Sequence, residues 1–212
     1  MSLLNELSSA TGDKNSNNEL VKRCLTTPAF LHSISEGLRT GTPKAQDDCM
    51  FIMLEIGKRR PELLSTFASD FFDTSRGATT KSKKLRCQAL EGLSRIAHVA
   101  GSELFAEREY LLETARAGGP QGLAAAGVLA ALCAASANYR GKLLVHTLRL
   151  FKAVPAKALP RWVAALAPSV EGSADGLKRF LRELEPRRGE LDDAANKKVD
   201  KVIVTIERTI KR

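Results

Sequence analysis

Apolar residues recur every three or four positions over residues 85–96, the pattern of a helix with one apolar face. A small residue, Ala89, lies within this stripe. Similar stripes occur before and after it, at spacings of 34 to 40 residues: Ala45, Cys49, Met53 and Ile56; Gln121, Ala125, Leu129 and Leu132; and Pro155, Leu159, Val163 and Leu166. Periods of about 35 to 45 residues indicate stacked helical hairpins. The pattern therefore predicts an all-α protein, an α-solenoid (superhelix) of stacked antiparallel helical hairpins.

Residues that cap or break helices predict where the helices begin and end. Residues 1–18 are rich in Ser, Asn and Gly, so we expect a mobile N-terminal segment with at most a short helix. Residues 19–212 are predicted to form a single helical-repeat domain, in which Thr42 and Pro43 mark one helix start. Residues 73–84 lack periodicity and predict the longest interior loop. A capping helix is expected over 192–211, although its β-branched VIVTI segment would also suit a short strand.

Composition favours helices packed through aliphatic side chains. Aromatic residues make up only 5% of the chain, which suits an alanine-rich core. The four cysteines lie far apart, so we expect buried, reduced thiols in a reducing compartment. The first 30 residues lack the pattern of a signal peptide, and we expect a cytoplasmic location. Residues 117–139 carry no charge, but their strongly apolar part is shorter than the roughly 20 residues that cross a bilayer. A buried central helix, and no membrane segment, is therefore predicted.

Residues 85–96 resemble the second helix of a HEAT repeat. In that consensus an apolar residue is followed by Arg, then by a small residue, and then by two apolar residues at helical spacing. The corresponding residues here are Leu85, Arg86, Ala89, Leu93 and Ile96. As a pattern of helical pairs, the resemblance to HEAT-like and armadillo-like repeat proteins covers about residues 43–185. It implies a curved solenoid that binds proteins, and sometimes nucleic acids, without carrying out chemistry.

Positive charge is concentrated in the second half of the chain. The net charge is +9, yet residues 1–73 hold 8 basic and 10 acidic residues, and no acidic residue lies between Glu113 and Glu171. Within that stretch Lys142, His146 and Arg149 share one face of a predicted helix. Such a stripe would attract phosphates or acidic protein segments. The alternative interpretation is a solvated helix face without a binding role. The candidate binding residues are Lys142, His146, Arg149, Lys152, Lys157, Arg161 and Trp162.

A second basic cluster falls in and after the predicted loop. Flexible basic loops often contact phosphate backbones, although an exposed loop without a binding role is the alternative. Its members are Arg76, Lys81, Lys83, Lys84 and Arg86. Trp162, beside Arg161, would offer a stacking surface next to positive charge or would pack partly in the core.

No pattern of residues predicts catalysis. Some alkylpurine DNA glycosylases are built of HEAT-like repeats, and this chain is similar to them in size and basicity. In that class several aromatic residues surround a catalytic carboxylate, whereas an acid-free stretch surrounds Trp162. His32, His98 and His146 are isolated from Cys and from one another, so no metal site or cofactor is predicted. We expect a non-enzymatic scaffold or adaptor with a protein partner. The alternative is a nucleic-acid-binding protein, which would include a glycosylase-like DNA-repair protein built of HEAT repeats, and a structural subunit of a larger assembly is a third interpretation.

Overall fold

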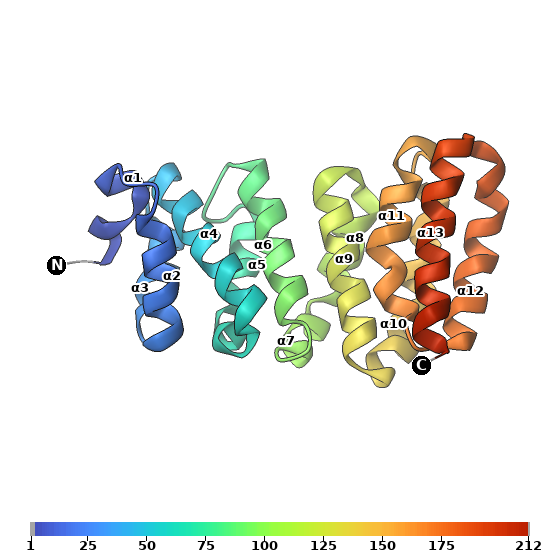
Figure 1. The fold of residues 1–212 in the computed structure, drawn as a ribbon, viewed down its shortest axis with the longest axis horizontal. Helices are drawn as coiled ribbons and strands as arrows, with labels where there is room; N and C mark the ends of the chain where they lie inside the picture. The colour runs from blue at the N-terminus through green and yellow to red at the C-terminus, as the bar shows by residue number, and fades with distance from the viewer. Residues whose placement is uncertain (1–2, 212) are drawn as a thin grey trace. The chain divides into compact units, whose positions relative to one another are not determined.

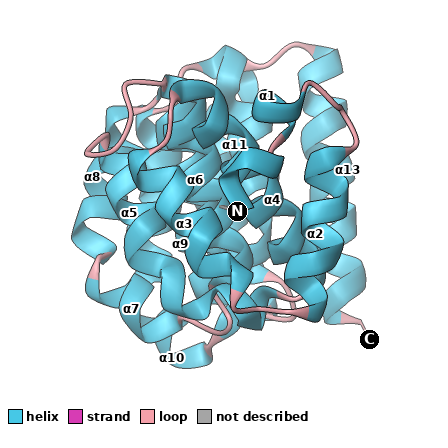
Figure 2. Ribbon diagram, turned by 90° about the vertical axis from the view of Figure 1, so that its left-hand side faces the viewer, coloured by secondary structure: helices cyan, strands magenta, loops and turns pink. Residues whose placement is uncertain are grey.

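The computed structural model describes residues 3–211, which are mostly helical and contain no strand (Figure 2). The chain divides into two compact units, Met1–Ala100 and Gly101–Arg212. The all-α prediction is confirmed. The alternative strand is wrong, because the VIVTI segment is helical within α13 (Asp193–Ile210). That residues 19–212 form a single domain stays a prediction.

Unit 1, residues 1–100, consists of short helical elements followed by longer α-helices (Figure 1). Its elements are η1 (Leu3–Glu6), α1 (Ser8–Thr11), α2 (Ser16–Thr26), α3 (Phe30–Thr40), α4 (Pro43–Arg59), η2 (Pro61–Phe67), α5 (Ala68–Arg76) and α6 (Lys83–Ile96). α3 packs against α4, α5 packs against α6, and α4 also contacts α2 and α6. α4 and α6 carry two of the apolar stripes that the sequence predicts, and both stripes contribute to the core of unit 1.

The N-terminal part of unit 1 is bound to α4 by buried polar groups. Asn17 accepts a hydrogen bond from the backbone N–H of Ser8 at 2.9 Å and donates one to Asp48 at 2.6 Å. The other carboxylate oxygen of Asp48 accepts the N–H of Ser9 at 2.7 Å. The first long helix, α2, begins at Ser16, next to Asn17 of this network. The mobility of residues 1–18 stays a prediction, and residues 1 and 2 lie outside the described range.

Capping side chains set the starts of α4 and α6. Thr42 accepts a hydrogen bond from the N–H of Ala45 at 3.3 Å, which confirms the predicted start of α4 at Pro43. Ser82 accepts the N–H of Leu85 in the same way, so α6 begins at Lys83. The loop predicted over 73–84 is therefore shorter, since α5 continues to Arg76 and only residues 77–82 connect the two helices.

A glycine allows α5 and α6 to pack closely. A Cβ atom at Gly92 would lie 2.6 Å from the ring of Phe71, which is fully buried on α5. Phe71 therefore packs directly against the backbone of α6. The apolar stripe of α6 predicted from the sequence is buried throughout, at Leu85, Ala89, Leu93 and Ile96.

Unit 2, residues 101–212, is organised around an uncharged helix (Figure 1). Its elements before α13 are α7 (Gly101–Ala106), α8 (Arg108–Ala117), α9 (Gly119–Ala135), α10 (Ala137–Arg149), η3 (Leu150–Ala153), η4 (Ala156–Ala158), α11 (Leu159–Leu166), η5 (Ala167–Val170), α12 (Ala174–Leu184) and η6 (Glu185–Glu190). α8, α10 and α11 all pack against α9, which buries Ala125, Leu129 and Leu132. α9 is thus the buried central helix that the sequence predicts. Within residues 3–211, no helix has both the length and the apolar character that a membrane crossing requires.

The last helix, α13, packs against α11 and α12. It begins after Asp192, whose carboxylate accepts the N–H of Ala195 at 2.7 Å. Val199 and Ile206 are buried, whereas the other apolar residues of its predicted helical stretch, Val202, Ile203 and Ile210, are partly exposed. The helix therefore covers α11 and α12 with a narrower apolar face than the sequence suggests.

The four cysteines are free thiols with unequal burial. Cys24, Cys49 and Cys133 are fully buried, as predicted, but Cys87 is only partly buried. Burial raises the pKa of Cys24 to about 11, of Cys49 to about 12 and of Cys133 to about 11. These three thiols therefore remain protonated at neutral pH. Their reducing compartment stays a prediction.

Candidate functional site

The stripe predicted from the acid-free stretch is exposed along unit 2. Its six basic residues lie on α10, η3, η4 and α11, and all are solvent-exposed: Lys142, His146, Arg149, Lys152, Lys157 and Arg161. On the other side of the same segment, Leu144, Leu148 and Phe151 are buried. The basic side chains of this segment therefore lie in solvent, and its apolar side chains lie in the core.

Trp162 does not belong to that exposed face. Its side chain is 4% exposed, on the buried side of α11. The alternative of core packing is confirmed, and stacking of a base on an exposed indole is excluded for this conformation. Trp162 and Arg161 both line a hollow, which we call the Trp162 hollow.

Cationic side chains of α8 and α10 surround a hollow of about 340 Å³, the Phe105 hollow. The two helices pack against the same central helix, α9, which brings residues about 30 positions apart to one opening. The side chains that determine its character are Phe105, Arg108, Leu112, Arg116, Lys142 and His146. One carboxylate, that of Glu109, also lines it and lies 3.5 Å from the guanidinium of Arg108. The remaining cations have no such partner.

Phe105 is enclosed by its neighbours. The guanidinium of Arg108 and the ammonium of Lys142 lie over its ring, 4.8 and 5.3 Å from the centroid. The ring of Tyr139 stacks against it with centroids 5.0 Å apart and an interplanar angle of 21°. Tyr139 in turn lies against the backbone of Gly101, where an added Cβ would come within 2.8 Å of its ring. Phe105 therefore positions two cations rather than presenting a free aromatic face.

Two cations and one histidine of the Phe105 hollow are unpaired. Within residues 3–211, no carboxylate lies within ion-pair distance of Arg116, Lys142 or His146. The cause lies in the sequence, since the stretch between Glu113 and Glu171 has no acidic residue to pair with them. Like charges gathered without a counter-charge raise the local concentration of anions.

Two neighbouring hollows share cations with one another and with the Phe105 hollow. Arg116 lines both the Phe105 hollow and the Trp162 hollow, which has a volume of about 360 Å³. Arg161 lines both the Trp162 hollow and a groove of about 820 Å³ between α11 and α13, where Lys157 and Lys198 also lie. We call these residues the basic surface: Arg108, Arg116, Lys142, His146, Lys157, Arg161 and Lys198. Arg149 and Lys152 line none of the three hollows, and Lys152 lies 3.5 Å from Glu183.

Several members of the basic loop cluster interact with other residues of unit 1. Lys84 forms an ion pair with Asp47 at 3.0 Å, and the guanidinium of Arg76 lies 5.3 Å from the ring centroid of Phe72. Arg86 is half-buried and donates to the carbonyl of Thr80 at 3.5 Å. The cluster's remaining members, Lys81 and Lys83, are exposed.

Two important residues of the Phe105 hollow were not predicted. Phe105 and Arg108 lie on either side of the break between α7 and α8, within the sequence FAER. Nothing in that short segment indicates that Lys142 will approach it, because the approach depends on how α8 and α10 pack on α9. Arg116 is visible in the sequence only as a basic residue at the start of the acid-free stretch.

The described residues also include no group of three His, Cys, Asp or Glu side chains arranged to hold a metal ion. No family model, curated protein or solved structure matches the chain.

Proposed function

We propose that this chain is a non-enzymatic scaffold or adaptor of HEAT-like helical hairpins, which binds an acidic segment of a partner protein on the basic surface of unit 2. The observation that carries the proposal is the convergence of Arg116, Lys142 and His146 on one hollow without a carboxylate partner. Cations held in this way gain from binding an anion, since they give up no existing ion pair.

The HEAT-like part of the proposal rests on how consecutive helices pack. In unit 1, α3 packs against α4 and α5 against α6, and in unit 2, α8 packs against α9. Consecutive helices joined by short connections and packed in pairs are the elements of HEAT-like hairpins. The apolar stripe of α6, which carries the resemblance, is fully buried, as the inner face of such a helix requires.

An acidic protein segment suits the site better than single-stranded nucleic acid. Single strands bind through aromatic side chains that stack on bases, as well as through cations. Here Trp162 is buried, and the ring of Phe105 is engaged by Arg108, Lys142 and Tyr139. Carboxylates need only the cations that line the hollow.

The test is binding of a short fluorescein-labelled peptide of Glu and Leu residues, with a labelled DNA duplex and single strand beside it. Measurements at about 0.05 M and about 0.15 M salt separate electrostatic from apolar contributions. We expect the peptide to bind, and the Lys142→Ala/His146→Ala variant to weaken its binding about tenfold at the lower salt. Lys178→Ala, which removes an exposed cation that lines none of the hollows described above, should leave binding unchanged.

Two outcomes would overturn the proposal. Absence of peptide binding at the lower salt would show that the unpaired cations do not form a binding surface. Tighter binding of either nucleic acid than of the peptide, lost in the same variant, would replace the protein partner with nucleic acid.

A further inference from the structure

The Trp162 hollow differs in chemistry from the rest of the basic surface. It lies within unit 2, between the end of α8, the start of α9 and the segment from η3 to α11, and encloses about 360 Å³. That volume lies in the range of small-molecule sites, which is about 300 to 1,000 Å³. Its floor is apolar, formed by Leu123, Leu150, Val154, Ala158 and the indole of Trp162.

Two arginines supply all of the charge in this hollow. Arg116 and Arg161 line it and are solvent-exposed, and neither has an ion-pair partner among residues 3–211. No acidic side chain lines the hollow, and no hydroxyl, amide or imidazole side chain does. A sugar or nucleoside would therefore find few hydrogen-bonding partners, whereas a single anionic group would find two guanidinium groups suited to carboxylate geometry.

The indole of Trp162 adds a third polar group. The side chain is 96% buried, yet its N–H donates to no group among residues 3–211. It is also not among the unpaired side-chain polar atoms that are fully shielded from solvent. The N–H therefore has no protein acceptor among these residues. A buried indole usually has a hydrogen-bond partner.

We propose that the Trp162 hollow binds a small amphipathic carboxylate, with its aliphatic or aromatic body against Leu150, Val154 and Trp162 and its carboxylate between Arg116 and Arg161. The apolar floor disfavours strongly hydrated ligands, and the two guanidinium groups that line the hollow favour a negative head. This site differs from the peptide-binding proposal in its ligand and shares only Arg116 and Arg161 with the basic surface.

The chain provides its own reporter for this site, because Trp162 is its only tryptophan. The probe is 8-bromooctanoate, whose bromine quenches indole fluorescence on contact, with octanoate as competitor and octan-1-ol as the neutral analogue. We expect saturable quenching that octanoate reverses, and binding of octan-1-ol at least about tenfold weaker, the equivalent of one lost ion pair.

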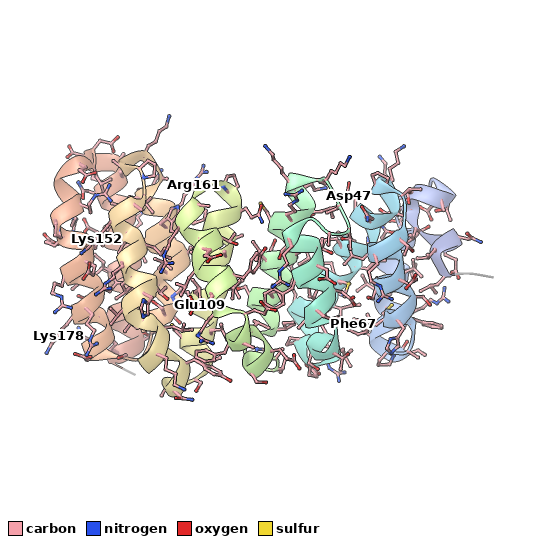
Figure 3. All side chains as sticks on the ribbon, turned by 180° about the vertical axis from the view of Figure 1, so that it is seen from behind. Asp47, Phe67, Glu109, Lys152, Arg161 and Lys178 are labelled. Carbon is pink, nitrogen blue, oxygen red and sulfur yellow. The ribbon has the colours of Figure 1, made fainter. Side chains whose placement is uncertain are left out.

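Three variants localise the binding. Arg161→Ala should weaken 8-bromooctanoate about fivefold or more. Ala158→Leu, which fills the hollow without changing its charge, should abolish saturable quenching while leaving peptide binding intact. Lys178→Ala is the matched control, since this exposed cation lies near the opposite end of the unit 2 helices from Arg161 (Figure 3).

The readouts separate the two proposals. Loss of peptide binding in Lys142→Ala/His146→Ala with unchanged quenching would leave this site intact, because neither residue lines it. Circular dichroism of Ala158→Leu establishes that its helices are retained, and Arg161→Ala tests the site without altering packing. Quenching that does not saturate, equal affinity for octan-1-ol and octanoate, or wild-type affinity in Arg161→Ala would overturn the proposal.

Discussion

The basic loop of unit 1 and the basic surface of unit 2 look alike in sequence but differ in how their charges are used. Lys84 pairs with Asp47, and Arg86 donates to a backbone carbonyl in its own loop. Arg116 and Lys142 have no carboxylate partner among residues 3–211. The net charges alone, +3 for residues 1–100 and +6 for residues 101–212, do not reveal this difference. A cluster of cations becomes available for binding only where the fold leaves acids out of reach.

The interiors of the two units differ in how their buried polar side chains are bonded. Unit 1 buries a set of polar side chains, among them Asn17, Gln46 and Asp70. Gln46 donates to the carbonyls of Leu38 and Thr79, at 3.0 and 2.8 Å, and so joins three segments. Unit 2 is built around the apolar α9, and its buried Thr147 bonds to the carbonyl of Leu143 in its own helix and to the thiol of Cys133 on α9. One buried amide thus joins three segments in unit 1, whereas the bond from Thr147 to α9 in unit 2 is made with a thiol, a weak hydrogen-bonding group.

Both units should respond most strongly to truncation of a core leucine. Leu93 in unit 1 and Leu129 in unit 2 are fully buried. Replacing either with Ala should lower the free energy of unfolding by about 2 to 5 kcal/mol, since each leaves a cavity. Urea denaturation measures the change, and a loss below about 1 kcal/mol would remove that leucine from the core as described.

Buried polar side chains should contribute more to the free energy of unfolding in unit 1 than in unit 2. Gln46→Ala leaves the carbonyls of Leu38 and Thr79 without their donor, so we expect a loss of about 1 to 3 kcal/mol in urea denaturation. The matched change in unit 2 is Thr147→Val, which removes a bond to the carbonyl of Leu143 in the preceding turn and a weak bond with the thiol of Cys133. That variant should lose less than about 1 kcal/mol. Equal losses would contradict the contrast between the two interiors.

Alkaline pH should destabilise unit 1 more than unit 2. Burial raises the pKa of Cys24 and Cys49 in unit 1 to about 11 and 12, and of Cys133 in unit 2 to about 11, from a value of 9.0 in the unfolded chain. The unfolded state therefore loses these protons first. Stability is fully present below pH 9 and falls as pH rises toward 11, by up to about 1.4 kcal/mol per pH unit for each thiol.

Hydrogen exchange resolved by unit measures this difference. Cys24→Ala in unit 1 should reduce the pH dependence of its opening, whereas unit 2 should keep the dependence that Cys133 imposes. A steeper decline in unit 2 than in unit 1 would contradict the assignment of the buried thiols.

Removal of unpaired surface cations should have the smallest effect on folding. Lys142 and Arg116 take part in no ion pair, so alanine at either position should change the unfolding free energy by no more than about 0.5 kcal/mol. The control is Lys84→Ala, which breaks the pair with Asp47 and should cost up to about 1 kcal/mol. A large loss in Lys142→Ala would mean that its contact with Phe105 holds unit 2 together.

Much of the fold could be predicted from local signals, but the candidate site could not. Thr42 and Asp192 cap their helices within three residues, so the sequence alone identifies where α4 and α13 begin. The uncharged run of α9 likewise identifies the central helix. By contrast, the hydrogen bond between Asn17 in α2 and Asp48 joins residues 31 positions apart, and no local signal indicates it.

The hollows depend on contacts over similar distances along the chain. Phe105 meets Lys142 only because α8 and α10 both pack on α9. The basic stripe itself could be found from the spacing of Lys142 and His146, since a helix places such residues on one face. The burial of Trp162 and the pairing of Lys84 with Asp47 required the tertiary structure.

The most direct test of the central claim compares the two basic clusters in one binding assay. Labelled Glu- and Leu-containing peptide is titrated with the wild type, with Lys142→Ala/His146→Ala from unit 2, and with Lys81→Ala/Lys83→Ala from unit 1. Each variant removes two exposed basic side chains. Our account predicts about tenfold weaker binding for the unit 2 variant and less than about twofold for the unit 1 variant. Equal losses in the two variants, or a larger loss in the unit 1 variant, would contradict it.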